Sequence, residues 1–200
     1  MSEPPRLFSI GHSNHSAEGF VDLLKKHDID VLVDVRSHPY SRYAPQFDTS
    51  GLKALLAKAG VKYLYLGREL GGRPEGNDYY DAEGHVLYAL LATSPLFLEG
   101  IDRLQKGTQT YRVALMCAEE DPLNCHRRLL IGRVLRECGL ALDHIRGDGR
   151  LQTEEELLRA EVRQHSGSEQ AGLFDAPQEA AWRSTRSVSR RNQPPSSSER

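Results

Sequence analysis

Short apolar runs alternate along the chain with amphipathic stretches of helical length. The runs that predict buried strands are 6–10, 31–35, 61–66, 111–116 and 140–145. The second run, Val31–Val35, is rich in β-branched residues, as is typical of parallel strands covered on both faces. Strand and helix repeated in turn, with short links, predict one parallel sheet with helices on both faces. We therefore expect a three-layer α/β fold.

Capping residues and stop signals place the helices. The predicted helices cover 16–27, 51–59, 85–92, 94–107, 122–138 and 153–164. Asp121-Pro122 is a typical helix opening, because an N-cap acid is followed by proline at the first helical position. If Pro122 begins this helix, Cys125 lies in its first turn, where the helix dipole lowers a thiol pKa.

The domain boundary is expected near residue 165. Residues 1–165 form a single α/β domain by these patterns, and 67–81 is a long irregular segment of the kind that is often functional or mobile. From Ser166 to Arg200 the composition shifts to Ser, Arg, Gln, Pro and Gly. This composition predicts a disordered tail over 166–200.

Charge and cysteine content narrow the class of protein. The 200 residues carry 26 basic and 28 acidic side chains, a net charge of −2, so overall charge predicts no strong attraction to nucleic acid or membrane. Three cysteines and a polar start without an apolar leader indicate free thiols in a reducing compartment. No window has the ~18 apolar residues of a spanning helix. We expect a soluble, cytoplasmic protein with no membrane partner.

Reactive side chains follow several of the predicted strands. Parallel strands end at the same edge of a sheet, so these side chains should converge there. Ligands of open parallel sheets bind beyond this edge. They are His12 and Ser13 after the first strand, Asp34 and Arg36 at the end of the second, and Cys117, Glu119, Cys125, His126 and Arg127 after the fourth. The sequence thus places one candidate site at a single edge of the sheet.

Two arginines of this set are expected to need an anion. Arg36 directly follows a buried strand, and Arg127 leans toward the apolar stripe of its helix. A buried guanidinium is costly unless it is paired. The partner is either internal, such as Asp34 or Glu119, or a bound phosphate or carboxylate.

These residues support an enzyme that acts on a phosphate-bearing substrate, such as a nucleotide or damaged nucleic acid, with a link to DNA repair. Its catalytic residues would be Cys117, Glu119, Cys125 and His126, and its substrate-binding residues His12, Ser13, Asp34, Arg36 and Arg127. The thiols would be nucleophiles or metal ligands, and Glu119 or His126 the acid or base. The alternatives are a non-catalytic nucleotide or nucleic-acid binding module, a redox sensor, and a set of purely structural residues.

Several known motifs are absent from the sequence. A phosphatase-type loop needs arginine six residues after Cys117, but that position is Leu123. No Gly-x-Gly-x-x-Gly follows the first strand. Cys117, Cys125, His126 and His12 are chemically able to bind zinc, yet their spacing matches no standard finger or ribbon. No metal site is therefore predicted, and the cofactor is left unknown.

Three short motifs resemble a known family. They are Gly11-His12-Ser13, Asp34-Val35-Arg36 and Cys117-x-Glu119-x(5)-Cys125-His126-Arg127, of which the third is the specific one. Together they resemble the domain-of-unknown-function family 488, over roughly Leu7 to Arg159. The resemblance implies a Rossmann-like α/β domain of prokaryotic type and names no reaction.

The polar tail contains one apolar island. Gln170, Leu173 and Phe174 form the pattern Gln-x-x-Leu-Phe, which resembles the peptide by which bacterial replication and repair proteins bind the DNA sliding clamp. A disordered segment can present adjacent Leu and Phe to an apolar pocket while the glutamine hydrogen bonds beside it. We therefore predict the sliding clamp as a partner.

Changing Leu173 and Phe174 to alanine should weaken clamp binding by at least about 10-fold, because both apolar anchors of the peptide are lost. Calorimetric titration of the full chain with the clamp measures this. An unchanged affinity, or no binding by the unaltered chain, contradicts the prediction.

Overall fold

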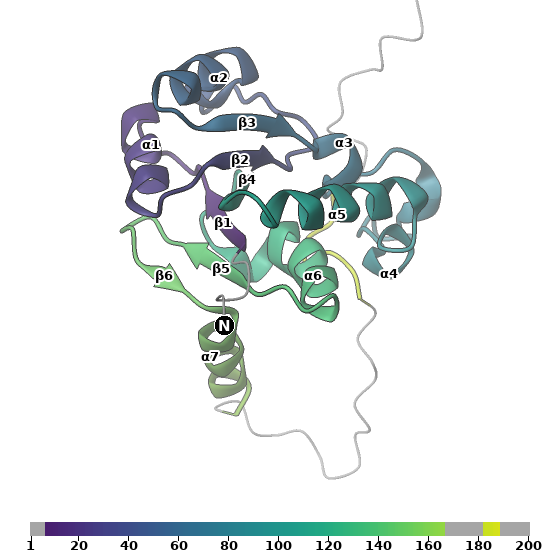
Figure 1. Cartoon of the computed structure of the whole chain (residues 1–200). Helices are drawn as coiled ribbons and strands as arrows, with labels where there is room; N and C mark the ends of the chain where they lie inside the picture. The colour runs from purple at the N-terminus through teal and green to yellow at the C-terminus, as the bar shows by residue number, and fades with distance from the viewer. Residues whose placement is uncertain (1–6, 167–181, 189–200) are drawn as a thin grey trace, which may run out of the picture.

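A computed structural model describes residues 7–166 and 182–188 of the chain. Within them a six-stranded sheet has the order β3-β2-β4-β1-β5-β6 (Figure 1). The strands are β1 (Leu7–Gly11), β2 (Val31–Asp34), β3 (Lys62–Tyr65), β4 (Val113–Cys117), β5 (Leu142–Ile145) and β6 (Leu151–Gln152). The first five are parallel, and only β6 pairs in antiparallel fashion, with β5. The expected three-layer α/β fold is confirmed, and β6 is an addition to it.

Helices cover both faces of this sheet. One face carries α1 (Ala17–Lys26) and α2 (Thr49–Lys58), and the other carries α3 (Gly67–Leu70), α4 (Tyr88–Leu91), α5 (Pro95–Thr108) and α6 (Arg133–Glu137). The last helix, α7 (Glu154–Ser166), follows β6. A capping box begins this helix, since Thr153 and Glu156 exchange hydrogen bonds between side chain and backbone N–H at 2.8 and 3.2 Å.

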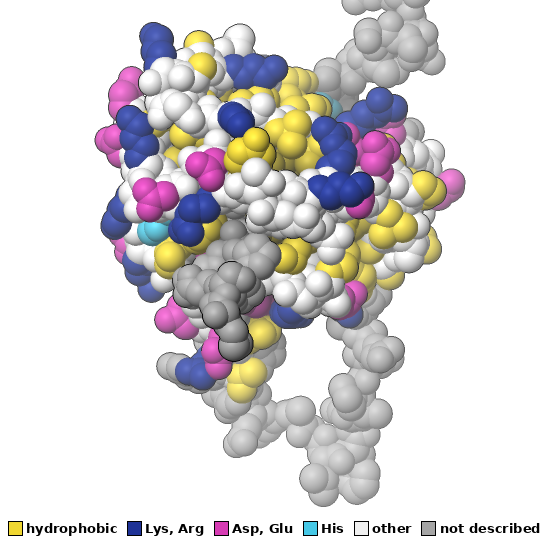
Figure 2. All heavy atoms as spheres, in the orientation of Figure 1, with side chains coloured by type: hydrophobic (Ala, Val, Ile, Leu, Met, Phe, Trp, Pro, Cys, Tyr) yellow, Lys and Arg dark blue, Asp and Glu magenta, His cyan; other side chains and the backbone are white. Residues whose placement is uncertain are grey.

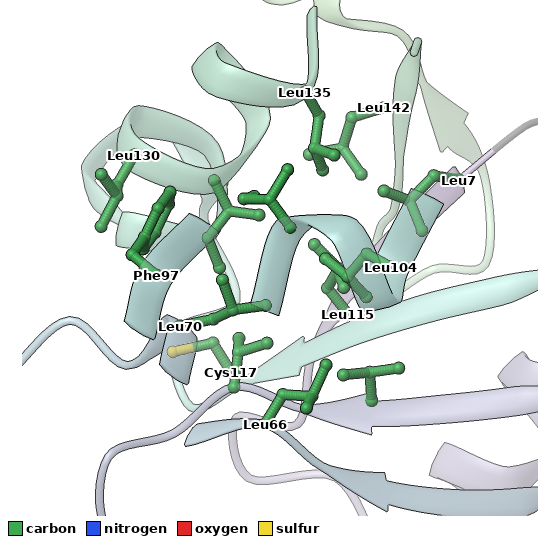
Figure 3. Close-up of a cluster of buried hydrophobic side chains, with 14 of the residues drawn as sticks. Leu7, Leu66, Leu70, Phe97, Leu104, Leu115, Cys117, Leu130, Leu135 and Leu142 are labelled. Atoms are coloured by element: carbon green, nitrogen blue, oxygen red, sulfur yellow. The ribbon is translucent and has the colours of Figure 1, made fainter. Parts of the chain in front are cut away.

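Strand β4 divides the hydrophobic core into two clusters. Leu115 and Cys117 face the cluster under α5 and α6, whereas Ala114 and Met116 face the one under α1 and α2. This is the alternation of a strand buried on both sides. Figure 3 shows Cys117 at the end of β4, beside Leu66 and Leu70. The buried core therefore extends up to Cys117 of the candidate site.

The predicted helix 122–138 is wrong at its start. Pro122–Asn124 forms a single 3-10 turn, η3, which Asp121 caps through the Leu123 N–H. Cys125 is then extended, with φ −106° and ψ 138°. Helical structure resumes as a π-helical segment, η4 (Arg127–Gly132), that continues into α6. Cys125 therefore precedes the helix, and the dipole of a helix starting at Pro122 does not act on it.

The predicted helix 85–92 is shorter than expected. Val86 pairs with Tyr80, and Leu87 pairs with Arg183, each in an isolated antiparallel bridge. These backbone hydrogen bonds use the groups that a helix would need, so α4 begins only at Tyr88.

Residues 182–188 lie against the domain as a strap. Sequence composition places them in a disordered tail, whereas the structure gives them a defined path, drawn in yellow in Figure 1. The Trp182 indole N–H donates to the Leu129 carbonyl at 2.8 Å, and the Ser184 N–H donates to the Val86 carbonyl at 2.9 Å. Gln170, Leu173 and Phe174 lie outside the described residues.

Charges on the surface are mixed. On the face shown in Figure 2, basic and acidic side chains are interspersed. Among the described helices, none has both the length and the apolar composition required to span a membrane.

Helix α7 is tied to the domain through Arg128. This buried side chain donates to Glu154 at 2.9 and 3.0 Å and to Glu161 at 2.7 and 2.9 Å. Arg128→Ala should lower the free energy of unfolding by about 1.5–3 kcal/mol, because hydrogen bonds between charged groups are lost at a site largely shielded from water.

Urea denaturation measures this loss, and Arg159→Ala is the control. Arg159 pairs with Glu155 on the exposed side of the same helix, so its removal should cost less than about 0.5 kcal/mol. Equal losses in the two variants would contradict the structural role of Arg128.

Candidate functional site

The carboxyl ends of β1, β2 and β4 meet at one cavity. The register aligns Gly11 with Cys117 and Asp34 with Met116, so the residues that follow these strands lie side by side. The cavity has a volume of about 370 Å³, within the usual size range of small-molecule sites. It is lined by His12, Arg36, Ser37, His38, Tyr40, Ser41, Gly72, Arg73, Tyr88, Cys117, Ala118, Glu119, Asn124, His126 and residues 184–188.

Four side chains form a thiol cluster beside this cavity: Cys117, Glu119, Cys125 and His126. The Cys117 thiol donates to Glu119 Oε2 at 2.9 Å, and the Cys125 thiol lies 3.3 Å from the same oxygen. His126 Nδ1 lies 3.7 Å from Cys117 Sγ and 3.8 Å from Cys125 Sγ. The two sulfurs and the His126 nitrogen thus face a common point, and the Glu119 oxygen lies beside the sulfurs, which suits thiol chemistry or the binding of a soft divalent cation.

The His126 ring is fixed from behind. Its Nε2 lies 3.1 Å from the Val35 carbonyl oxygen, which can only accept a hydrogen bond. In the neutral imidazole this leaves Nδ1 without a proton, directed at the two thiols. Gly72 packs so closely on the ring that a Cβ there would be 2.7 Å from His126 Cγ. The backbone on both sides therefore sets the orientation of the ring.

Electrostatic interactions separate the two thiols. The hydrogen bond with Cys125, together with burial, raises the pKa of Cys117. Burial opposes ionisation of Cys125, but the interaction with the neighbouring Cys117 side chain and the positive charges of Arg127 and His126 lower its pKa. Cys125 is thus the thiol whose surroundings favour the thiolate, for reasons that do not involve a helix dipole.

The carboxyl group of the cluster is held ionised. Burial would raise the pKa of Glu119, but hydrogen bonds from Cys117 and from its own backbone N–H, with the charge of His126, lower it to about 2. Glu119 is therefore a carboxylate at neutral pH, available as a hydrogen-bond acceptor or as a ligand.

Arg127 holds the loop that carries Glu119. Its guanidinium donates to the backbone carbonyls of Glu119 and Glu120, the latter at 2.6 Å, and its Nε donates to Ser9 Oγ at 3.1 Å. The side chain is 1% exposed and does not line the cavity. The partner of this arginine is therefore internal, although the acceptors are backbone carbonyls rather than the expected carboxylate.

Arg36 is also paired internally, but it does reach the cavity. Asp34 accepts from its Nε at 2.9 Å and from its Nη2 at 2.7 Å, a bidentate ion pair. Arg36 Nη1 lies 3.2 Å from His12 Nε2, and the other ring nitrogen of His12 lies 3.0 Å from the Ser13 carbonyl. Burial is the main cause that lowers the pKa of His12, so the neutral ring accepts from Arg36.

The predicted site residues thus fall into two groups. Cys117, Glu119, His126, His12 and Arg36 line the cavity. Cys125, Asp34 and Arg127 are buried behind this first group, and Ser13 is half-buried and does not line the cavity. The sequence predicted that these nine residues gather at the carboxyl end of the sheet, and they do, but it did not distinguish the residues that face the cavity from those that do not.

Two basic residues of the cavity were not predicted, Arg73 and Arg186. Arg73 belongs to the glycine-rich part of segment 67–81, for which a functional role was considered in general terms only. Arg186 lies on the strap, within a stretch whose composition carries no signal for order. Neither arginine forms an ion pair with a residue that the structure describes.

The strap is anchored beside the cavity at several points. The Arg133 guanidinium lies 4.2 Å above the Trp182 ring, and Tyr88 packs edge-on against it. Arg183 pairs with Asp81 and Glu83. These contacts place residues 184–188 along one wall of the cavity.

Comparison with known proteins identifies the family. The family model of the domain of unknown function DUF488 matches residues 16–134, more than half of the chain. This confirms the resemblance for the second and third motifs, while Gly11-His12-Ser13 precedes the matched region. No curated protein is similar enough to match. A crystal structure of a DUF442 protein from Shewanella putrefaciens CN-32, named as a candidate phosphatase, matches with 15% identity and a TM-score of 0.36, over 68% of this chain and 69% of that chain.

Gly11 is required where the Glu119 loop crosses the end of β1. A Cβ at this position would lie 1.9 Å from the Glu119 carbonyl oxygen, a contact that the backbone would have to relieve. Gly11→Ala should therefore lower the free energy of unfolding by about 2–3 kcal/mol, as overpacking does in well-packed cores.

Gly107→Ala in α5 is the matched control, because nothing lies within 4 Å of a Cβ there. It should raise stability by about 0.5–1 kcal/mol, the usual helix preference for alanine over glycine. Denaturant unfolding of both variants checks the pair. A Gly11→Ala protein as stable as the unaltered chain would contradict the close approach.

Proposed function

The chain belongs to the DUF488 family, and we propose that it is an enzyme acting on a phosphate-bearing small molecule, with the thiol cluster as its reacting centre. The observation that carries this proposal is the position of the cluster. Two thiols lie within hydrogen-bonding reach of both a carboxylate and an imidazole, at the wall of a cavity whose other charged side chains are basic.

Charge in the cavity favours an anionic ligand. Arg36, Arg73 and Arg186 line it, and Glu119 is the single acidic side chain among the lining residues that the structure describes. Arg36 is held in place by Asp34, whereas Arg73 and Arg186 are exposed and can turn toward a ligand. Guanidinium groups bind phosphate oxygens through paired, charge-assisted hydrogen bonds.

Cavity size supports a small substrate. About 370 Å³ is near the lower end of the range for ligand sites, which suits a nucleotide-sized phosphate ester. The strap narrows access from one side, which makes a nucleic-acid duplex a poor fit. A link to DNA repair depends on the clamp-binding pattern in the tail and stays a prediction, as does a cytoplasmic location.

Roles within the cluster follow from which groups face the cavity. Cys117, Glu119 and His126 line it, so they can contact a bound ligand, whereas Cys125 lies behind them. A thiol beside an imidazole is the pairing used in nucleophilic catalysis, and the same groups can hold a metal. Glu119 or His126 would exchange a proton with the substrate.

A non-catalytic binding module is the second candidate. It is favoured by the internal pairing of Asp34, Arg36 and Arg127, which gives these residues a structural role without any reaction. The two candidates differ in their dependence on the thiols, because a binding module needs only the basic lining.

Binding of adenosine monophosphate and inorganic phosphate, measured by calorimetry, tests the anion site. Arg73→Gln and Arg186→Gln should each weaken binding by about 10-fold, since each removes one charge-assisted contact. Arg159→Gln should not change the affinity for phosphate, because Arg159 does not line the cavity. Absence of binding, or an equal loss in the control, contradicts the proposal.

Turnover separates the enzyme from the module. Product formation from a panel of phosphate esters should be lost in Cys117→Ser while phosphate binding is retained. Phosphate binding without any turnover in the unaltered chain would instead favour the binding module.

A further inference from the structure

We propose that Cys117, Cys125 and His126, with Glu119 as the fourth ligand, bind one zinc ion. The inference does not rest on the proposed function, because metal binding by these side chains requires no substrate.

Separation of the donor atoms is the first argument. The ligand atoms of Cys117, Cys125 and His126 all lie within 4.8 Å of one another. Zinc binds sulfur at about 2.3 Å and nitrogen at about 2.0–2.1 Å, so a tetrahedral site separates these two atoms by about 3.5 Å. His126 Nδ1 lies 3.7 and 3.8 Å from the two sulfurs. The three side chains therefore need only small movements to share one ion.

Glu119 supplies the fourth donor. Its Oε2 approaches both sulfurs, at 2.9 Å for Cys117 and 3.3 Å for Cys125. Glu119 does not belong to the group whose ligand atoms all lie within 4.8 Å of one another, so its carboxylate has to move toward the ion to become the fourth ligand. Two sulfurs, one nitrogen and one oxygen are donors that zinc accepts in tetrahedral sites.

Orientation of His126 is an independent observation that points to a ligand. Its Nε2 is engaged by the Val35 carbonyl at 3.1 Å, so a ring that gives up its Nδ1 proton to become a metal ligand directs the lone pair of Nδ1 at the sulfurs. Metal-binding histidines usually donate their second N–H to a carbonyl or carboxylate in this manner. The ring is half-buried, and the Val35 carbonyl on one side and Gly72 on the other limit its freedom to turn away.

Charge balance is consistent with a divalent cation. Two thiolates and one carboxylate carry three negative charges, and zinc supplies two positive ones. The remaining charge is compensated by Arg127, a buried cation that interacts electrostatically with both thiols. On binding, the ion replaces the two thiol protons, which pass to solvent.

Access to the ion comes from the cavity. Cys117, Glu119 and His126 line it, whereas Cys125 closes the site from behind. The Glu119 loop is the exposed side of the site, so its carboxylate is the ligand that a molecule in the cavity could displace. Catalytic zinc sites have three protein ligands and one exchangeable position.

Cobalt titration of the metal-free full chain, prepared with a chelator and a reductant, tests the proposal. One equivalent should give a thiolate-to-cobalt charge-transfer band and the strong visible bands of tetrahedral coordination. Loss of a side chain that supports a metal ligand weakens metal binding by about 10–100-fold. Cys125→Ser and His126→Gln each remove a ligand, so they should weaken cobalt binding by more than this. Cys138→Ser is the matched control, because this thiol is exposed and outside the cluster, and it should bind as the unaltered chain does.

Native mass spectrometry of the unaltered chain keeps the test decisive if a variant fails to fold. The expected species carries one zinc and has lost two protons. The proposal is overturned if this species and the cobalt band are both absent. It is also overturned if Cys117 and Cys125 remain joined by a disulfide after treatment with the reductant. Glu119→Gln should keep the charge-transfer band but alter the visible bands, and unaltered visible bands would overturn its assignment as fourth ligand.

The two proposals fail separately. Zinc binding without phosphate binding would overturn the proposed function and support the metal site, and phosphate binding by a chain that takes no metal would do the reverse.

Discussion

The buried guanidinium of Arg127 is the interaction on which the site depends. It lies at the start of η4 and donates to two carbonyls of the loop after β4 and to the Ser9 hydroxyl on β1. A charge this deeply buried is tolerated because several acceptors converge on it. The acceptors in turn draw the loop across Gly11, where only a residue without Cβ leaves room. Glu119 is thereby turned back toward the thiols.

Charged side chains behind the walls of the cavity differ in their contacts from those that face it. Behind its walls, Asp34 neutralises Arg36, and the loop carbonyls satisfy Arg127. At the walls, the thiol cluster carries the acidic and nucleophilic groups, while Arg73 and Arg186 are exposed. The supporting residues are thus occupied by internal contacts, and the groups facing the cavity are the ones left to bind a ligand or an ion.

The strap joins two distant parts of the chain at this site. Trp182 packs between Arg133 and Tyr88, and Ser184 continues the hydrogen bonding of Val86. The half-buried indole, the ion pairs of Arg183 and the backbone hydrogen bonds of Ser184 and Val188 together offset the cost of ordering this short segment. These contacts together place Arg186 at the cavity wall.

The sequence by itself determined the layers of the fold and the end of the sheet at which the reactive side chains converge. Strand periodicity and caps such as Ser16 depend on neighbouring residues, so they can be recognised locally. The tertiary structure decided what each residue contacts. Cys125 was expected in a helical turn but is extended, Arg127 was expected to bind an anion but holds a loop, and the thiol cluster fits no spacing rule for zinc. These outcomes depend on how β1, β4 and η4 pack, which brings together atoms whose separation along the chain carries no pattern.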